Sequence, residues 1–262
     1  ALDGVEDGII SDPLACNIDF SKFTACAEDN PAEECFTSRQ IAAIQTVYAG
    51  TYEGQQEIHP GFPPGCEGER GGWWGWITGM GQRNAENVPF AKHFAFGPDI
   101  LRYFVYNDPD WDYREYDFAD FSTKTAFASA TLDATSTDYS AFKDRGSKMI
   151  IYHGWNDPAL SALATIRHYE DAIQADQEID SAIRLFLLPG VLHCGGGPGP
   201  SQTDWLGLLK DWVENGNPPE KVLMTKKEKR KVLITRPVFP YPKKAVYDGQ
   251  GDPNEASSFV AK

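Results

Sequence analysis

Apolar residues change their spacing along the chain near residue 140. Beyond this point, short apolar runs at residues 148–153 and 183–188 alternate with segments 159–175 and 201–215, in which apolar residues recur at helical spacing. Short apolar runs that stop at Gly or Pro are typical of buried parallel strands. The order strand, helix, strand, helix therefore predicts an α/β unit with a parallel sheet in residues 136–262.

The first half of the chain has a different pattern, which predicts a single helix over residues 39–48 with Ser38 as its N-cap. The rest of residues 1–135 is dense in Gly, Pro and aromatic residues and has few amphipathic stretches. We expect a separate loop-rich domain here, in which the aromatic side chains form either a small core or the wall of a pocket. The tail, residues 221–262, is basic at first and then polar, and we assign no element to it.

The charge balance narrows the classes of partner. Asp and Glu total 38 against 24 Lys and Arg, which gives a net charge of -14. Such a surface repels phosphate backbones and anionic lipid, so we expect neither a nucleic-acid nor a membrane partner. A soluble protein that binds cations and a plain solvated acidic surface are the two alternatives. No run of about 18 apolar residues occurs, and no membrane span is predicted.

Five cysteines raise the question of pairing, because an odd number leaves at least one thiol unpaired within the chain. Cys26 and Cys35 bracket a polar loop that a local disulfide would close. No pair has CxxC spacing, which argues against a zinc ribbon or a redox site of the thioredoxin type. The alternative is a set of buried free cysteines in a cytosolic protein.

Two residues suited to proton transfer follow the two predicted strands. Asp157 comes after the first strand and His193 after the second, and functional groups of α/β sheets gather at these carboxyl ends. In α/β hydrolases the acid and the base follow late strands in this order, and the acid orients the imidazole. His153 competes for the role of base, but its place just before a turn glycine favours a structural hydrogen bond.

The nucleophile of such a triad is missing from the chain. No Gly-x-Ser-x-Gly elbow occurs, and no serine before Asp157 has glycines on both sides between a strand and a helix. The chain also begins without Met and without the basic and apolar regions of a signal peptide. We therefore expect Ala1 to be a processed or truncated start, with the serine on a segment before it.

Three motifs in order resemble the tannase and feruloyl esterase family, which also contains hydrolases of mono(hydroxyethyl) terephthalate. They are LDGVEDGI at residues 2–9, GWNDP at 154–158 and HCGGGPGP at 193–200. The resemblance implies the C-terminal part of an α/β-hydrolase fold in residues 136–262, preceded in residues 1–135 by an inserted lid domain. It also implies that Asp157 is the triad acid and His193 the base.

The resemblance further implies a pairing for four of the cysteines. In the family, the Cys after the catalytic His is joined to a Cys just before the Ser, so Cys194 would be linked to a segment outside this chain. Cys16 would likewise pair upstream, while Cys26 and Cys35 match a local disulfide of the lid. The implied partner is an N-terminal fragment of the same precursor, and Cys66 is left without an assignment.

The opening motif resembles the family's calcium loop. The resemblance gives side-chain ligands at Asp3 and Asp7 and main-chain carbonyl ligands at Val5 and Ile9, with one further Asp expected just before Ala1. Oxygen donors in a flexible loop are the ligands that Ca²⁺ selects. Without the resemblance, two acidic residues in a loop indicate little more than a solvated turn.

A function follows from these expectations. We predict a secreted or periplasmic serine carboxylic ester hydrolase that acts on small aromatic acid esters of the feruloyl, galloyl or related type. The aromatic stretches at 73–76 and 104–111 are candidates for the wall of its acyl pocket. The alternatives are a calcium-stabilised binding module without chemistry, which the missing serine would favour, and a degenerate hydrolase kept as a scaffold.

Overall fold

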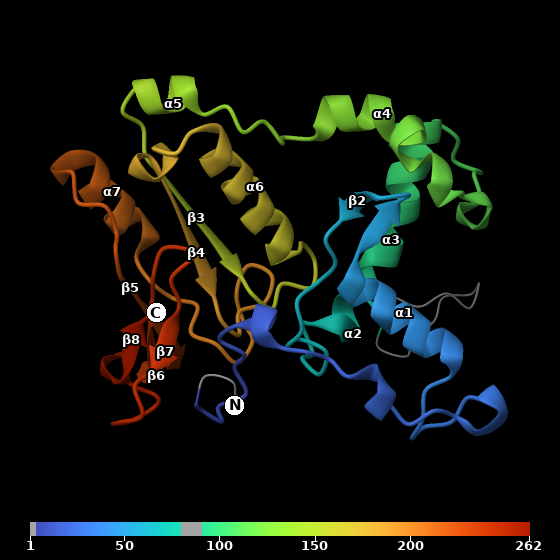
Figure 1. Ribbon diagram of the computed structural model, residues 1–262, viewed down its shortest axis with the longest axis horizontal. Coiled ribbons are helices and arrows are strands. Elements are labelled where there is room, and N and C mark those ends of the chain that lie inside the picture. Colours follow the sequence, from blue (N-terminus) through green and yellow to red (C-terminus); the bar gives the residue numbers. More distant parts are fainter. Residues whose placement is uncertain (1–3, 80–90) are drawn as a thin grey trace.

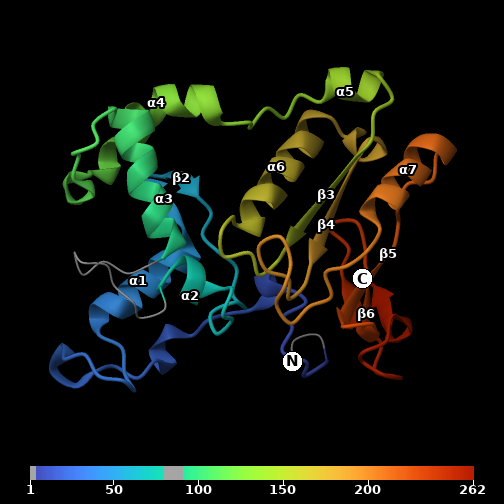
Figure 2. The same ribbon diagram turned by 180° about the vertical axis from the view of Figure 1, so that it is seen from behind.

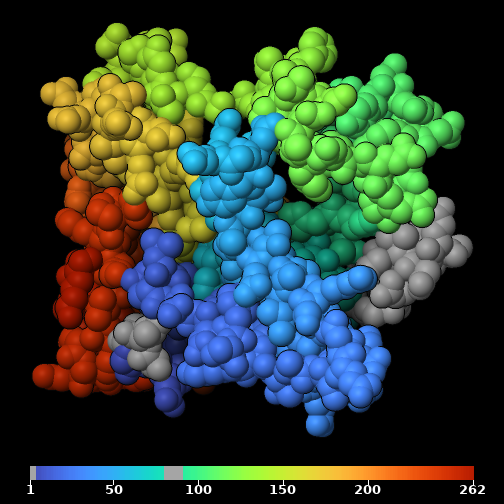
Figure 3. Space-filling view, turned by 45° about the vertical axis from the view of Figure 1, so that its right-hand side comes forward, coloured from blue at the N-terminus to red at the C-terminus, as the bar shows by residue number. Residues whose placement is uncertain are grey.

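The computed structural model describes residues 4–79 and 91–262 and shows two regions side by side (Figures 1 and 2). We call residues 4–79 and 91–135 the N-terminal region, and residues 136–262, which hold the parallel strands, the C-terminal region. The two regions touch at several places, one of which is the ion pair between Glu57, on the first hairpin, and Arg167 of a C-terminal helix. Figure 3 shows the light-blue hairpin segment beside the yellow part of the C-terminal region. No helix among the described residues is long and apolar enough to cross a membrane.

The centre of the C-terminal region is a parallel pair of strands, β3 (Met149–Gly154) and β4 (Ile183–Leu188), as the two apolar runs predicted. Their register places Met149 beside Ile183 and Gly154 beside Leu188, so both strands end at the same edge. Leu185 and Phe186 are fully buried because helices and a hairpin cover the two faces of β4. Pairs of apolar strands buried in this way stabilise α/β folds chiefly through the hydrophobic effect.

Two helices pack on this pair: α6 (Ala162–Ala175) and α7 (Trp205–Asn215). Helix α6 begins later than the apolar pattern predicted, because the Asp157 carboxylate accepts the N–H groups of Ala159 and Leu160 and Ser161 then caps the helix. Its buried face carries Ala162, Ile166, Tyr169 and Ala172, and Leu160 lies outside the helix and is exposed. Helix α7 buries Trp212 and ends at Gly216, which has the left-handed conformation typical of a C-cap.

The tail, which the sequence left without elements, forms two antiparallel hairpins. The first joins β5 (Val222–Glu228) to β6 (Lys231–Val238), and the second joins β7 (Ala245–Tyr247) to β8 (Phe259–Ala261). Val222 and Met224 alternate inward and pack on Phe186 of β4. The run of Lys and Glu at the turn of the first hairpin hid this short alternation from sequence reasoning.

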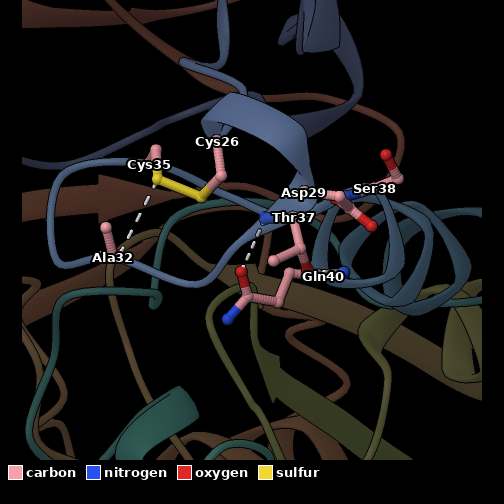
Figure 4. Close-up of a disulfide and its surroundings, with 7 residues drawn as sticks. All are labelled: Cys26, Asp29, Ala32, Cys35, Thr37, Ser38 and Gln40. Carbon is pink, nitrogen blue, oxygen red and sulfur yellow. Dashed lines mark hydrogen bonds between the residues drawn. A yellow bond between two sulfur atoms is a disulfide. The ribbon is translucent and has the colours of Figure 1, made fainter.

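The N-terminal region contains α1 (Ser38–Ala49), the helix that the sequence predicted. Its N-cap is Thr37 and not Ser38: the Thr37 hydroxyl accepts from the Gln40 N–H, and the Gln40 side chain accepts from the Thr37 N–H, a capping box (Figure 4). Cys26 and Cys35 form the predicted local disulfide just before this cap.

Further elements of the N-terminal region were not predicted, because α3 (Lys92–Ile100) contains Gly and Pro and α4 (Phe121–Leu132) is only weakly amphipathic. A connecting helix, α5 (Ser140–Asp144), leads into β3. The other elements here are β1 (Thr51–Glu53), β2 (Gln56–His59), α2 (Trp73–Trp76), α3 (Lys92–Ile100), a π-helical turn (Leu101–Tyr106) and α4 (Phe121–Leu132). Short 3-10 turns of this region lie at Pro13–Ala15, Phe20–Lys22, Ala27–Asp29, Tyr113–Glu115 and Phe118–Asp120. In the C-terminal region, such turns lie at Ile179–Ser181 and Ala256–Ser258.

Candidate active site

The loops that follow β3 and β4 lie against each other because the two strands are parallel and end together. The Trp155 N–H donates to the Leu188 carbonyl at 2.9 Å, and the Asn156 N–H donates to the Val191 carbonyl at 3.0 Å. Gly154 permits this contact, since a β-carbon there would lie 2.3 Å from the Val191 oxygen. Main-chain hydrogen bonds thus hold the two predicted catalytic loops in register.

This arrangement brings Asp157 and His193 together, although 36 positions separate them. His193 Nδ1 lies 2.9 Å from Asp157 Oδ2. The Asp157 side chain is 6% exposed and that of His193 is 34% exposed, so the pair runs from the interior toward the surface. A carboxylate only accepts, so Nδ1 carries the proton in this hydrogen bond and Nε2 is free to accept a proton from another group.

The carboxylate of Asp157 is fixed from several sides. Its Oδ1 accepts from the N–H groups of Ala159 at 2.8 Å and Leu160 at 3.0 Å. Burial alone would raise its pKa, but the hydrogen bonds from His153, Leu160, His193 and Ala159 outweigh burial and lower the pKa to about 2. Asp157 is therefore ionised at neutral pH and is directed at the imidazole.

His153 has the structural role that the sequence favoured for it. Its Nδ1 is 2.8 Å from the Thr165 hydroxyl, and its Nε2 is 3.0 Å from the Leu160 carbonyl and 3.4 Å from Asp157 Oδ2. Both ring nitrogens thus have partners within the protein. His153 helps to hold Asp157 and is poorly placed to serve as a base.

The N-terminal region supplies aromatic side chains beside His193. The Trp76 ring lies edge-on to the His193 imidazole, with centroids 5.1 Å apart, and the Lys92 ammonium lies 4.4 Å from the centroid of the same indole. His93 contacts Trp76 at 5.7 Å, and its Nε2 is 2.7 Å from the Pro158 carbonyl. The sequence indicated the tryptophan run but gave no signal for His93, a single imidazole in a helix that was not predicted.

An open cavity of about 760 Å³ lies between the two regions and is bordered by His59, Phe62, His93, His153 and Leu160, among others. A second cavity, of about 730 Å³ and mostly apolar, lies within the N-terminal region between α3 and α4. Neither is bordered by His193 or Asp157. Volumes of this size are those of small-molecule pockets.

The predicted calcium loop is described in part, since Asp3 lies outside the described residues. Val5 and Ile9 are buried, and Asp7 Oδ1 accepts from the Ile9 N–H at 3.0 Å. The other oxygen of Asp7 is 2.9 Å from Nη2 of the buried Arg236 on β6. A carboxylate and main-chain carbonyls are the oxygen donors that a hard cation binds, whereas both oxygens of Asp7 accept from protein N–H groups in this structure. The described residues hold no group of three or more His, Cys, Asp or Glu side chains placed for a metal ion.

The remaining cysteines make no disulfide within the described part of the chain. Cys194 is exposed next to the base, in a left-handed backbone conformation, and Cys16 is half-buried. Cys66 is buried against Trp73 and Leu192, and burial raises the pKa of its thiol to about 12. Cys66 therefore belongs to the core as a small apolar side chain.

Comparison with known proteins places this site in a family. The family model described as "Tannase and feruloyl esterase" matches residues 1–262. The chain belongs to the tannase and feruloyl esterase family. It is 32% identical to a mono(2-hydroxyethyl) terephthalate hydrolase of Piscinibacter sakaiensis, over 99% of this chain and 49% of that protein. It is 29% identical to feruloyl esterase C of Talaromyces stipitatus, over 96% of this chain and 49% of that protein.

Solved structures agree with the family. Feruloyl esterase B from Aspergillus oryzae superposes with a TM-score of 0.83 at 25% identity, covering 100% of this chain and 53% of that one. Tannin acyl hydrolase from Aspergillus niger shares the fold, with a TM-score of 0.75 at 17% identity, over 100% of this chain and 50% of that one. The fold is thus α/β-hydrolase-like, and the chain spans about half the length of the family members it matches.

Proposed function

We propose that this chain supplies the acid and the base of a serine carboxylic ester hydrolase that acts on aromatic acid esters. The observation that carries the proposal is the 2.9 Å contact between His193 Nδ1 and Asp157, made at the carboxyl ends of adjacent parallel strands. Family membership supports ester hydrolysis as the reaction class. Among the described residues, Nε2 of His193 has no hydrogen-bond partner, as a base awaiting a hydroxyl requires.

The roles of the two residues follow from this geometry. A serine hydroxyl attacks the ester carbonyl while His193 Nε2 takes its proton, and the imidazolium then returns that proton to the leaving alcohol. The ionised Asp157 stabilises the imidazolium and keeps the Nδ1 proton in place. We assign the serine and the backbone donors of the oxyanion hole to a segment of the same precursor that precedes residue 1.

The proposed substrates have an aromatic acyl group, of the feruloyl, galloyl or related type. The N-terminal region acts as the lid, and its Trp76 ring lies beside His193, with centroids 5.1 Å apart. An indole at this position offers a flat apolar surface for an aromatic ring. A second tryptophan of α2, Trp74, is 50% exposed and is a further candidate for contact with the aromatic ring of the substrate.

The proposal is tested by hydrolysis of methyl ferulate and methyl gallate by the complete protein, with serine segment present. We expect the protein to hydrolyse both esters, and a serine-directed phosphonate should abolish this turnover. A protein that binds these esters without hydrolysing them would instead be the binding module or the degenerate hydrolase. Methyl butyrate serves as the aliphatic control, and equal rates on it would remove the aromatic part of the proposal.

A first prediction concerns the partner segment. We propose that Cys16 and Cys194 are disulfide-linked to the serine-bearing segment, and the existing Cys26–Cys35 disulfide supports an oxidising, secreted or periplasmic setting. If that segment is a separate chain, reduction should release a second polypeptide in intact-mass measurement. If it is continuous with this chain, peptide mapping without reductant should find both cysteines in cross-links. Alkylation of both as free thiols in oxidised native protein would contradict the proposal, whereas Cys66 should stay a thiol in either case.

A second prediction concerns calcium. We propose that Asp7, with the carbonyls of Val5 and Ile9 and the ligands before them, holds one structural Ca²⁺. Millimolar Ca²⁺ should then raise the melting temperature by a few degrees relative to chelator, because it binds only the folded state. The change Asp7→Asn should abolish this increase. The control Asp12→Asn, which removes a partner of Lys244 outside the loop, should retain it; an unchanged melting temperature in the parent protein would refute the site.

A further inference from the structure

The lid contacts the acid loop on both sides of Asp157. On one side, Nε2 of His93 is 2.7 Å from the carbonyl of the buried Pro158. On the other, the Asn156 side-chain amide donates to the Gly65 carbonyl. His93 and Gly65 lie in the lid, whereas Asn156 and Pro158 are the chain neighbours of Asp157.

Asn156 also joins the acid loop to the base loop. It is 1% exposed, its Oδ1 accepts from the Gly190 N–H at 3.1 Å, and its own N–H donates to Val191. Both ends of the amide are therefore used, one for the base loop and one for the lid. Gly65 leaves room for this contact, since a β-carbon there would lie 2.6 Å from the Asn156 amide nitrogen.

His93 is fixed in orientation as well as position. Its ring lies edge-on between Phe62, at 5.6 Å, and Trp76, at 5.7 Å, and the same Trp76 contacts His193. The Pro158 carbonyl can only accept, so Nε2 of His93 carries a proton. One lid imidazole thus contacts the acid loop through a hydrogen bond and the base through a shared tryptophan.

We propose that His93 and Asn156 form a clamp through which the lid sets the position of the Asp157–His193 pair, with both acting as positioning residues. The proposal rests on the proposed function, because it assigns a task to that pair. Asp157 sits in a loop between β3 and α6, and without the clamp the lid side of this loop would lose two hydrogen bonds. Displacement of an acid–base pair by about 1 Å lowers turnover by about 10²-fold.

The test compares His93→Phe, which keeps an aromatic ring between Phe62 and Trp76 but lacks the donor, with His93→Gln, whose amide can still donate to Pro158. In the complete protein, His93→Phe should lower kcat for methyl ferulate about 10- to 100-fold while KM changes less than about threefold. His93→Gln should keep more of kcat than His93→Phe. The matched control is Tyr52→Phe, which likewise keeps an aromatic ring and removes one hydrogen-bond donor, here the hydroxyl that donates to Glu57 on the first hairpin.

A second readout does not depend on turnover. The proton shared by His193 Nδ1 and Asp157 should give a downfield NMR resonance, which His93→Phe should shift or broaden and Tyr52→Phe should leave unchanged. Asn156→Ala should alter the same resonance, and its melting temperature separates this effect from unfolding. A parent protein without esterase activity would refute the proposed function while the resonance still tested the clamp. An unchanged kcat and an unchanged resonance in a folded His93→Phe protein would overturn the clamp.

Discussion

His193→Ala is expected to reduce ester turnover by about 10⁴- to 10⁶-fold in the complete protein. In the proposed mechanism the imidazole takes the serine proton and returns it to the leaving alcohol, and alanine offers neither function. KM should change little, because the side chain is 34% exposed and makes its described hydrogen bond to Asp157 alone. Steady-state hydrolysis of methyl ferulate, monitored by absorbance, gives both constants.

The matched control for this prediction is His168→Ala. His168 lies on α6 and is hydrogen-bonded to the Tyr139 hydroxyl at 2.7 Å, away from the Asp157 carboxylate. The His168→Ala protein should retain turnover near that of the parent protein. His153→Gln should reduce turnover less than His193→Ala, because His153 only helps to hold Asp157 in place. Parent-like turnover in His193→Ala would show that the base has been assigned wrongly.

Asp157→Asn is expected to lower kcat by about 10⁴-fold. An asparagine can still accept from the Ala159 and Leu160 N–H groups through its oxygen, and it would then turn its NH₂ group toward His193 Nδ1. That arrangement favours the tautomer with the proton on Nε2, which cannot take a proton from serine. The expected signature is a loss of kcat in a protein that remains folded.

The pKa of Asp157 adds a pH-dependent check. Because the folded-state pKa is lowered to about 2, the ionised carboxylate stabilises the fold above the ordinary Asp pKa, and this contribution is lost as pH falls toward the folded value. Denaturant unfolding of Asp157→Asn should therefore depend less on pH between about 4 and 2 than unfolding of the parent protein. Asp171→Asn, which removes an exposed carboxylate on α6, controls for the loss of any carboxylate. Full turnover in Asp157→Asn would contradict the assigned role.

Much of the candidate site was readable from the sequence because its acid and base follow apolar strands. The runs that became β3 and β4 are short, bounded by turn residues and buried, and such runs identify parallel strands well. Their carboxyl ends then place Asp157 and His193 at one edge of the sheet. The local disulfide between Cys26 and Cys35 was likewise foreseen, since a separation of nine positions closes a small loop.

Other features escaped the sequence, one through a local choice of N-cap and the others because they depend on contacts between distant segments. The capping box of α1 moved the N-cap from Ser38 to Thr37, a choice made by one side chain three positions away. The hairpins of the tail gain their stability from packing on β4, which a short run of alternating residues does not reveal. Helix α3 contains Gly97 and Pro98, which disfavour a helix locally. Its formation therefore depends on its tertiary packing.

By itself, the sequence determined the α/β class, the parallel strands, and the residue types that follow each strand, because periodicity and turn chemistry are local properties. Only the tertiary structure decided that His193 reaches Asp157 at 2.9 Å, that His153 points to Thr165 and Leu160 instead, and that His93 and Asn156 link the Asp157 loop to the N-terminal region. These choices depend on side-chain orientation and on contacts across as many as 91 positions of the chain. No local preference encodes such a contact, since it forms only after the strands and the lid have packed together.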